Sequence, residues 1–431
     1  MPNDLHTLAI SEARWIGYPG DRPAAAPRTR IFRATVELPA APAENALLVA
    51  ADGRITLQIN GEFAGRGGGA AGAYFLPVGK FFCAGENVIS ASVDAAPGET
   101  GGFLLAGAPL ADAAWTSSPE GTAAEVLPEE LLPAARRREL SMIPETATPR
   151  RLLFCGTGSW EAMPGAFCRC RICSHALRHG GKDVRTRTCY NLGDDLQVDF
   201  GPDVIAQRDL HRLDYDKLRY LFISHPHEDH FSPMHLVMRD INSPSRHPLQ
   251  LLGSKESLDM YRNWFDANPE RQNIILREIR AGDAVTLPEN GVRLTAIPAN
   301  HNRGVGAFNY VVETENGAVI FLGTDTGFLK PEAWEILEGF RFDLVVLDCT
   351  AGLLDVPKTN SHMSAPQVIE VVGLFREKRL LDPGCRIFTN HISCLSQMTH
   401  EESCRYFAPH GVTPAYDGLA VPCVRGEKES R

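Results

Sequence analysis

The sequence lacks any apolar run long enough to cross a bilayer, for which about 20 consecutive residues would be needed. Its first residues, "MPNDLHTLAI", also lack the basic segment and following apolar stretch that are typical of a secretory signal. Positive charge is scarce, since 43 Lys and Arg stand against 53 Asp and Glu for a net charge of −10. These deficits argue against a membrane protein, a secreted protein and a stable nucleic-acid binder, which must neutralise many phosphates.

The remaining composition describes a globular chain with more than one core. Apolar residues make up 44% and charged residues 22% of the 431 positions, a length that favours two domains over one. The 11 cysteines, in a chain without a secretion signal, fit metal ligands or buried thiols better than disulfides. We therefore expect a cytoplasmic protein.

Local patterns divide the chain into three parts. Residues 1–112 contain short β-type runs between glycine-rich turns and predict an all-β, jelly-roll-like sandwich. Residues 113–149 are rich in Ala, Pro and charge and predict a linker. Strands and helices alternate over residues 150–431, which predicts an α+β domain. Within it, we expect helices to begin after Ser254, Ser364 and Thr399, the last two with capping boxes.

The stretch "FISHPHEDHF" at residues 222–231 gathers three histidines and two carboxylates directly behind the apolar run "YLF". Burying so many polar groups is costly unless a cation organises them. His301, Asp325 and His391 each follow another predicted strand, and ligands from separate strand ends can build a rigid metal site. Nitrogen and carboxylate donors suit zinc, manganese or iron. A polar loop of chance composition is the alternative.

The pattern His225-x-His227-x-Asp229-His230 matches the HxHxDH signature of the metallo-β-lactamase superfamily, which residues 150–431 resemble. The resemblance implies an αββα sandwich with two divalent ions that share a nucleophilic hydroxide. It assigns His225, His227 and His301 to one ion and Asp229, His230 and His391 to the other. It also implies that Asp325 bridges both ions and that Asp199 supports the ligands from behind. Three other histidines are expected to lie at the surface or to pack in the core rather than to bind metal: His211, His235 and His247.

Cys168, Cys170 and Cys173 form a CxCxxC pattern, and three thiolates at this spacing can converge on one ion. Three buried or oxidisable thiols are the alternative. The segment "LLFCGTGSWEAMPGAFCRCRIC" resembles the phosphoribosyl 1,2-cyclic phosphodiesterase branch of the superfamily. That branch holds a structural zinc whose fourth ligand, a histidine, lies three residues beyond the last catalytic histidine. Cys394 occupies this position here, so we expect a four-thiolate zinc site, with His175 as the competing fourth ligand.

The branch resemblance also suggests a reaction. "VVLDCTAG" followed by "NSHMS" resembles the segment that carries the family's proposed acid, which would be His362, although a structural role beside Ser364 is the alternative. We therefore expect a phosphodiesterase that cleaves a small anionic cyclic phosphate of a sugar or nucleoside, with Asp229 and His362 as catalytic residues. Lactonase or thioesterase chemistry, a tRNA-processing nuclease and a non-enzymatic binding protein are the alternatives.

The first domain resembles the β-sandwich accessory module of α-L-rhamnosidases. The resemblance is carried by Trp15-Ile16, Phe32-Arg33, Asn60-Gly61 and the segment "GENVI" at residues 85–89. It implies a carbohydrate partner. A purely architectural role, such as covering the active-site mouth or forming a homodimer, is an equal alternative.

Overall fold

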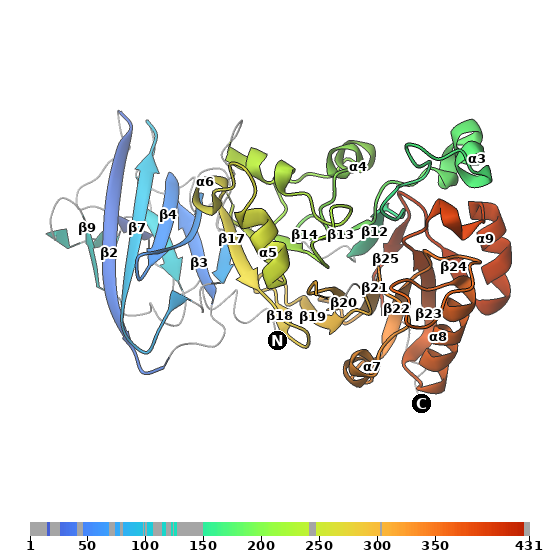
Figure 1. Ribbon diagram of the computed structural model, residues 1–431. Helices are drawn as coiled ribbons and strands as arrows, with labels where there is room; N and C mark the ends of the chain where they lie inside the picture. Colours follow the sequence, from blue (N-terminus) through green and yellow to red (C-terminus); the bar gives the residue numbers. More distant parts are fainter. Residues whose placement is uncertain are drawn as a thin grey trace.

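The computed structural model describes residues 15–17, 26–40, 46–68, 74–77, 81–97, 99, 101–106, 114–117, 122–123, 125–126, 150–240, 247–301 and 304–425. Two pairs of sheets account for its architecture (Figure 1). No helix among the described residues combines the length and the apolar character that crossing a membrane requires.

The N-terminal unit is an all-β sandwich, as the sequence predicts. Its sheets have the orders β11-β1-β8-β3-β6 and β10-β9-β2-β7-β4-β5. The long strands β2 and β7 pair antiparallel, and alternate residues of each are buried because successive side chains point to opposite faces. Phe32, Ile55, Ile89 and Phe103 pack between the sheets. The strands are β1 Trp15–Gly17, β2 Arg28–Leu38, β3 Ala46–Ala51, β4 Arg54–Ile59, β5 Glu62–Gly68, β6 Tyr74–Pro77, β7 Gly85–Ala95, β8 Phe103–Ala106, β9 Trp115–Ser117, β10 Thr122–Ala123 and β11 Glu125–Val126.

The linker prediction is wrong at its beginning. Strand β9 pairs with β2, and β11 pairs with β1, so these segments beyond residue 113 belong to the sandwich. Strands of two or three residues are too short to show an alternating pattern, and only pairing across the sheet identifies them. Residues 113, 118–121, 124 and 127–149 of the predicted linker lie outside the described residues.

The C-terminal unit contains two seven-stranded sheets, ordered β17-β16-β15-β14-β13-β12-β25 and β18-β19-β20-β21-β22-β23-β24. Large side chains such as Phe154, Phe222 and Tyr310 fill the space between them. The strands are β12 Arg151–Gly156, β13 Cys189–Leu192, β14 Leu196–Val198, β15 Tyr220–Phe222, β16 Leu249–Gly253, β17 Ile274–Glu278, β18 Ala284–Thr286, β19 Arg293–Pro298, β20 Phe308–Glu313, β21 Val319–Gly323, β22 Phe342–Asp348, β23 Leu381–Asn390, β24 Val412–Pro414 and β25 Ala420–Pro422.

Helices cover the outer faces of these two sheets. Leu258 and Tyr261 pack on one face, and Val371, Phe375 and Phe407 pack on the other, which gives the predicted αββα sandwich. The predicted caps are confirmed: Ser254 caps α5, and capping boxes begin α8 and α9. The helices are α3 Arg171–His179, α4 Val204–His211, α5 Lys255–Arg262, α6 Pro269–Gln272, α7 Pro331–Leu337, α8 Ala365–Glu377 and α9 His400–Phe407.

The N-terminal β-sandwich packs against β17, the edge strand of the first C-terminal sheet (Figure 1). Ile275 joins the apolar core of the sandwich, and the Asn273 side-chain amide donates a hydrogen bond to the Arg66 carbonyl at 2.9 Å. The contact covers a sheet edge that would otherwise offer unpaired backbone groups.

Candidate metal centre

Strand ends bring the predicted ligands together. His225 follows β15, His301 follows β19, Asp325 follows β21 and His391 follows β23. Asp325 and His391 have positive φ angles of 50° and 57°, which L-residues rarely adopt. Such strained backbone at the end of a rigid strand is common at functional sites, where it points a side chain in a required direction.

Three donor groups share Asp325: two contain the predicted ligands, and the third joins Asp325 and His391 to Asp348 and His362. His225, His227 and His301 form one group with Asp325, and Asp229, His230 and His391 form the other, with the donor atoms of each group within 4.8 Å of one another. Asp325 Oδ2 lies 3.1 Å from His225 Nε2 and 3.2 Å from His230 Nε2. All seven predicted ligands therefore converge on one location, with Asp325 between the two groups that contain them. These seven residues are called the cage below.

Unsatisfied buried atoms show that this constellation fits cations. Asp229 Oδ1 is buried without a hydrogen-bond partner, and Asp325 Oδ1 and His301 Nδ1 lie 3.2 Å apart without the geometry of a hydrogen bond. Leaving such atoms unpaired is costly, whereas metal coordination satisfies them. Burial lowers the pKa of His225, and it lowers the pKa of His301 to about 4, which favours the neutral imidazole that coordinates a metal. The donor set therefore fits two divalent ions.

Asp199 orients His230 from behind. Its Oδ2 atom lies 2.6 Å from His230 Nδ1, and its Oδ1 accepts a hydrogen bond from the Ser224 backbone at 2.8 Å. This arrangement turns His230 Nε2 toward Asp325, which is how a supporting carboxylate fixes a ligating imidazole. Burial lowers the pKa of His230, but the carboxylates of Asp229 and Asp199 outweigh it and raise that pKa well above its usual value.

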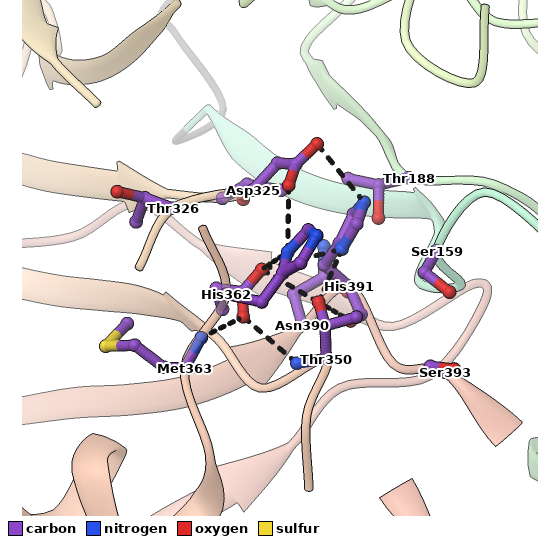
Figure 2. Close-up of polar contacts among 12 residues, drawn as sticks. Ser159, Thr188, Asp325, Thr326, Thr350, His362, Met363, Asn390, His391 and Ser393 are labelled. Carbon is purple, nitrogen blue, oxygen red and sulfur yellow. Dashed lines mark hydrogen bonds and ion pairs between the residues drawn. The ribbon is translucent and has the colours of Figure 1, made fainter. Parts of the chain in front are cut away.

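His362 lies beside the cage, as Figure 2 shows. Its Nδ1 is 3.0 Å from Asp325 Oδ1 and 3.3 Å from Asp348 Oδ2. Burial lowers the pKa of His362, but the adjacent carboxylates of Asp325 and Asp348 outweigh it and raise the pKa to about 11. His362 is therefore positively charged in this arrangement, and its Nε2 has no hydrogen-bond partner among the described residues.

The sequence reasoning missed Asp348. This fully buried carboxylate accepts hydrogen bonds from Thr350 Oγ1 at 2.8 Å and from the Met363 backbone at 3.0 Å. Thr350 Oγ1 lies in turn 2.7 Å from His391 Nδ1 (Figure 2). Asp348 thus supports His362 and, through Thr350, His391. Its position in the sequence could have identified it as a site residue, because it ends the apolar run "DLVVLD" just as Asp325 follows "AVIFLGT".

Four thiols form a separate group, in which the Sγ atoms of Cys168, Cys170, Cys173 and Cys394 lie within 4.8 Å of one another. Burial raises the pKa of Cys170, but the Cys173 backbone N–H and neighbouring thiols outweigh it and lower the pKa to about 7, which favours the metal-binding thiolate. The set fits one tetrahedral zinc ion. The competing ligand, His175, lies apart from the thiols and beside Asp183, at 3.4 Å.

Glu161 connects the thiols to the cage, a link that the sequence did not reveal. Its carboxylate accepts hydrogen bonds from Ser159 at 2.8 Å and from Ser393, and it lies 3.8 Å from Cys394 Sγ. Ser393 is two residues beyond His391. The loop that carries this cage ligand is therefore held from the thiol side.

The other histidines do not join these groups. His211 Nε2 lies 2.8 Å from the Cys155 carbonyl, and His247 is buried. Within the described part of the chain, neither of them nor His235 belongs to a group of potential metal ligands.

A family model and a solved structure agree with this fold. Residues 196–381 match the family model described as "Beta-lactamase superfamily domain". A crystal structure of a new diphosphatase from the PhnP family is similar at 20% identity and a TM-score of 0.50, over 64% of this chain and all of that chain. The structure of zinc-bound PqqB from Methylobacterium extorquens has 14% identity and a TM-score of 0.45, over 63% of this chain and 99% of that chain.

A glycosidase structure gives a weaker similarity. A Streptomyces avermitilis alpha-L-rhamnosidase gives a TM-score of 0.25 at 18% identity, over 42% of this chain and 21% of that chain. This value supports no argument, so the carbohydrate partner stays a prediction. No curated protein matches the chain.

Proposed function

The C-terminal domain is a member of the metallo-β-lactamase superfamily, and from this premise we propose that the protein is a metal-dependent phosphodiesterase. Its substrate would be a small anionic cyclic phosphate of a sugar or nucleoside. The observation that carries the proposal is the pair of donor groups that share Asp325 and leave buried atoms for cations to satisfy.

The cage residues would hold two divalent ions, which could be zinc, manganese or iron. The four thiols would hold a structural zinc. When bound, the two cage ions lower the pKa of water toward neutrality and offset charge on phosphate oxygens. Asp199 would keep His230 oriented, and Asp348 would do the same for His362 and, through Thr350, for His391.

His362 would supply the proton that the leaving alkoxide requires. Its Nδ1 is held between Asp325 and Asp348, which leaves Nε2 available to donate a proton to a substrate. Transfer from Nε2 to the leaving oxygen would produce the free hydroxyl group and a neutral imidazole. Proton donation matters for phosphodiesters because an alkoxide is a poor leaving group.

The test is hydrolysis by protein loaded with zinc or with manganese. We expect turnover of 2′,3′-cyclic nucleotides and bis(p-nitrophenyl) phosphate, with little turnover of simple lactones. Efficient lactone hydrolysis without diester hydrolysis would replace the proposal with acyl chemistry. Absence of both activities in fully loaded protein would support a binding role instead.

A further inference from the structure

Trp160 stands exposed beside the cage. The residue is 62% exposed, although tryptophan is usually largely buried. Its ring centre lies 6.1 Å from that of His227, a cage residue that is itself only partly buried. Among the described residues, the indole has no other ring contact and no hydrogen-bond partner. A large flat apolar surface therefore faces solvent next to the predicted metal ligands.

The backbone around Trp160 is held from two sides. The Trp160 carbonyl accepts a hydrogen bond from Arg187 Nε at 2.7 Å, and Arg187 pairs with Asp203 at 3.0 Å. On the other side, the Ser159 N–H donates to the Ile392 carbonyl at 3.2 Å, directly beside His391. Exposure of the ring therefore results from a fixed loop that presents it.

We propose that Trp160 is a specificity-determining residue that stacks on a flat aromatic ring of the substrate, so that the preferred substrates are nucleoside cyclic phosphates. This inference rests on the proposed function. A phosphate at the cage would lie near His227, and a base joined to it through one sugar would reach the adjacent indole. An indole face suits any nucleobase, because stacking needs a planar partner and no particular hydrogen-bond pattern.

Binding measurements test the inference without relying on turnover. Zinc-loaded protein would be titrated by calorimetry with AMP and with ribose 5-phosphate, which differ by the base. We expect wild-type protein to prefer AMP, and Trp160→Ala to weaken AMP binding about tenfold or more while ribose 5-phosphate binding stays within about twofold. Trp160→Phe should retain most of the preference. Phe265→Ala, which removes another exposed aromatic ring at 84% exposure, is the matched control and should change neither affinity.

Other outcomes overturn the inference. Equal weakening of both ligands in Trp160→Ala would show that the residue only supports the loop, and equal wild-type affinities would show that no base is recognised. Failure of the proposed function is distinguishable: base-dependent binding that requires Trp160, without hydrolysis of any diester, would leave the stacking role standing and remove the phosphodiesterase.

Discussion

The Sγ atoms of Cys168 and Cys394 lie 3.8 Å apart although 226 positions separate them in the chain. Cys168 precedes α3, and Cys394 follows β23 by way of the loop that carries His391. A zinc ion at this group would therefore tie the segment before α3 to a cage loop, and Glu161 strengthens the same connection.

Replacing Cys394 with serine should loosen this connection. We expect Cys394→Ser to lose about one zinc per chain and to unfold at a lower temperature, because a structural zinc contributes directly to folding. Zinc analysis and thermal unfolding in the presence of zinc measure both effects. His175→Ala is the control and should match the wild type. An unchanged melting temperature for Cys394→Ser would argue against its place in the site.

The second donor group depends on Asp229. This carboxylate lies 3.3 Å from His230 Nε2 and 3.6 Å from His391 Nε2. Asp229→Ala should reduce turnover at least about a hundredfold, since one ion would lose an anionic ligand. Metal analysis should show about one ion fewer per chain, while the circular dichroism spectrum stays native. Near-normal turnover with a full metal content would exclude Asp229 as a ligand.

An acid role for His362 predicts dependence on the leaving group. His362→Ala should lower kcat about a hundredfold or more for a cyclic nucleotide, whose alkoxide needs a proton, with little change in KM. The loss should be much smaller for bis(p-nitrophenyl) phosphate, because p-nitrophenolate leaves without protonation. Equal losses for both substrates would indicate that His362 has a structural role.

The largely buried carboxyl group of Glu289, which belongs to neither metal site, should make the folding stability of the protein depend on pH. Burial raises the pKa of Glu289 from 4.5 to about 7, although Arg219 and a hydrogen bond from Tyr220 at 2.5 Å oppose the shift. The folded state thus retains a proton that the unfolded state releases, so this contribution to stability is complete below pH 4.5 and disappears as the pH rises through about 7.

Glu289→Gln has no such proton to lose. We expect its free energy of unfolding to fall less than that of the wild type between about pH 5 and pH 8, and to exceed the wild-type value at the upper end. Urea unfolding at several pH values measures this difference. Glu335→Gln, a change of the same type at an exposed position on α7, should leave the wild-type profile unaltered. Parallel profiles for Glu289→Gln and the wild type would contradict the prediction.

Local sequence determined much of this protein. The close spacing of His225, His227, Asp229 and His230 predicts that they act as metal ligands from one loop. The positions of Asp325 and His391 after apolar strands predict that they are ligands too. The alternation of strands and helices and the capping boxes also followed from the sequence, because periodicity and caps act over a few residues, whereas the αββα arrangement was implied by the family resemblance.

The tertiary structure decided what depends on distant pairing. It brought Cys394 rather than His175 to the thiols, placed Asp348 behind His362 and assigned β9 to the sandwich. It also left Trp160 exposed beside His227. Contacts between residues far apart in the chain arise from how the sheets stack and where their loops meet, and no local spacing encodes that geometry.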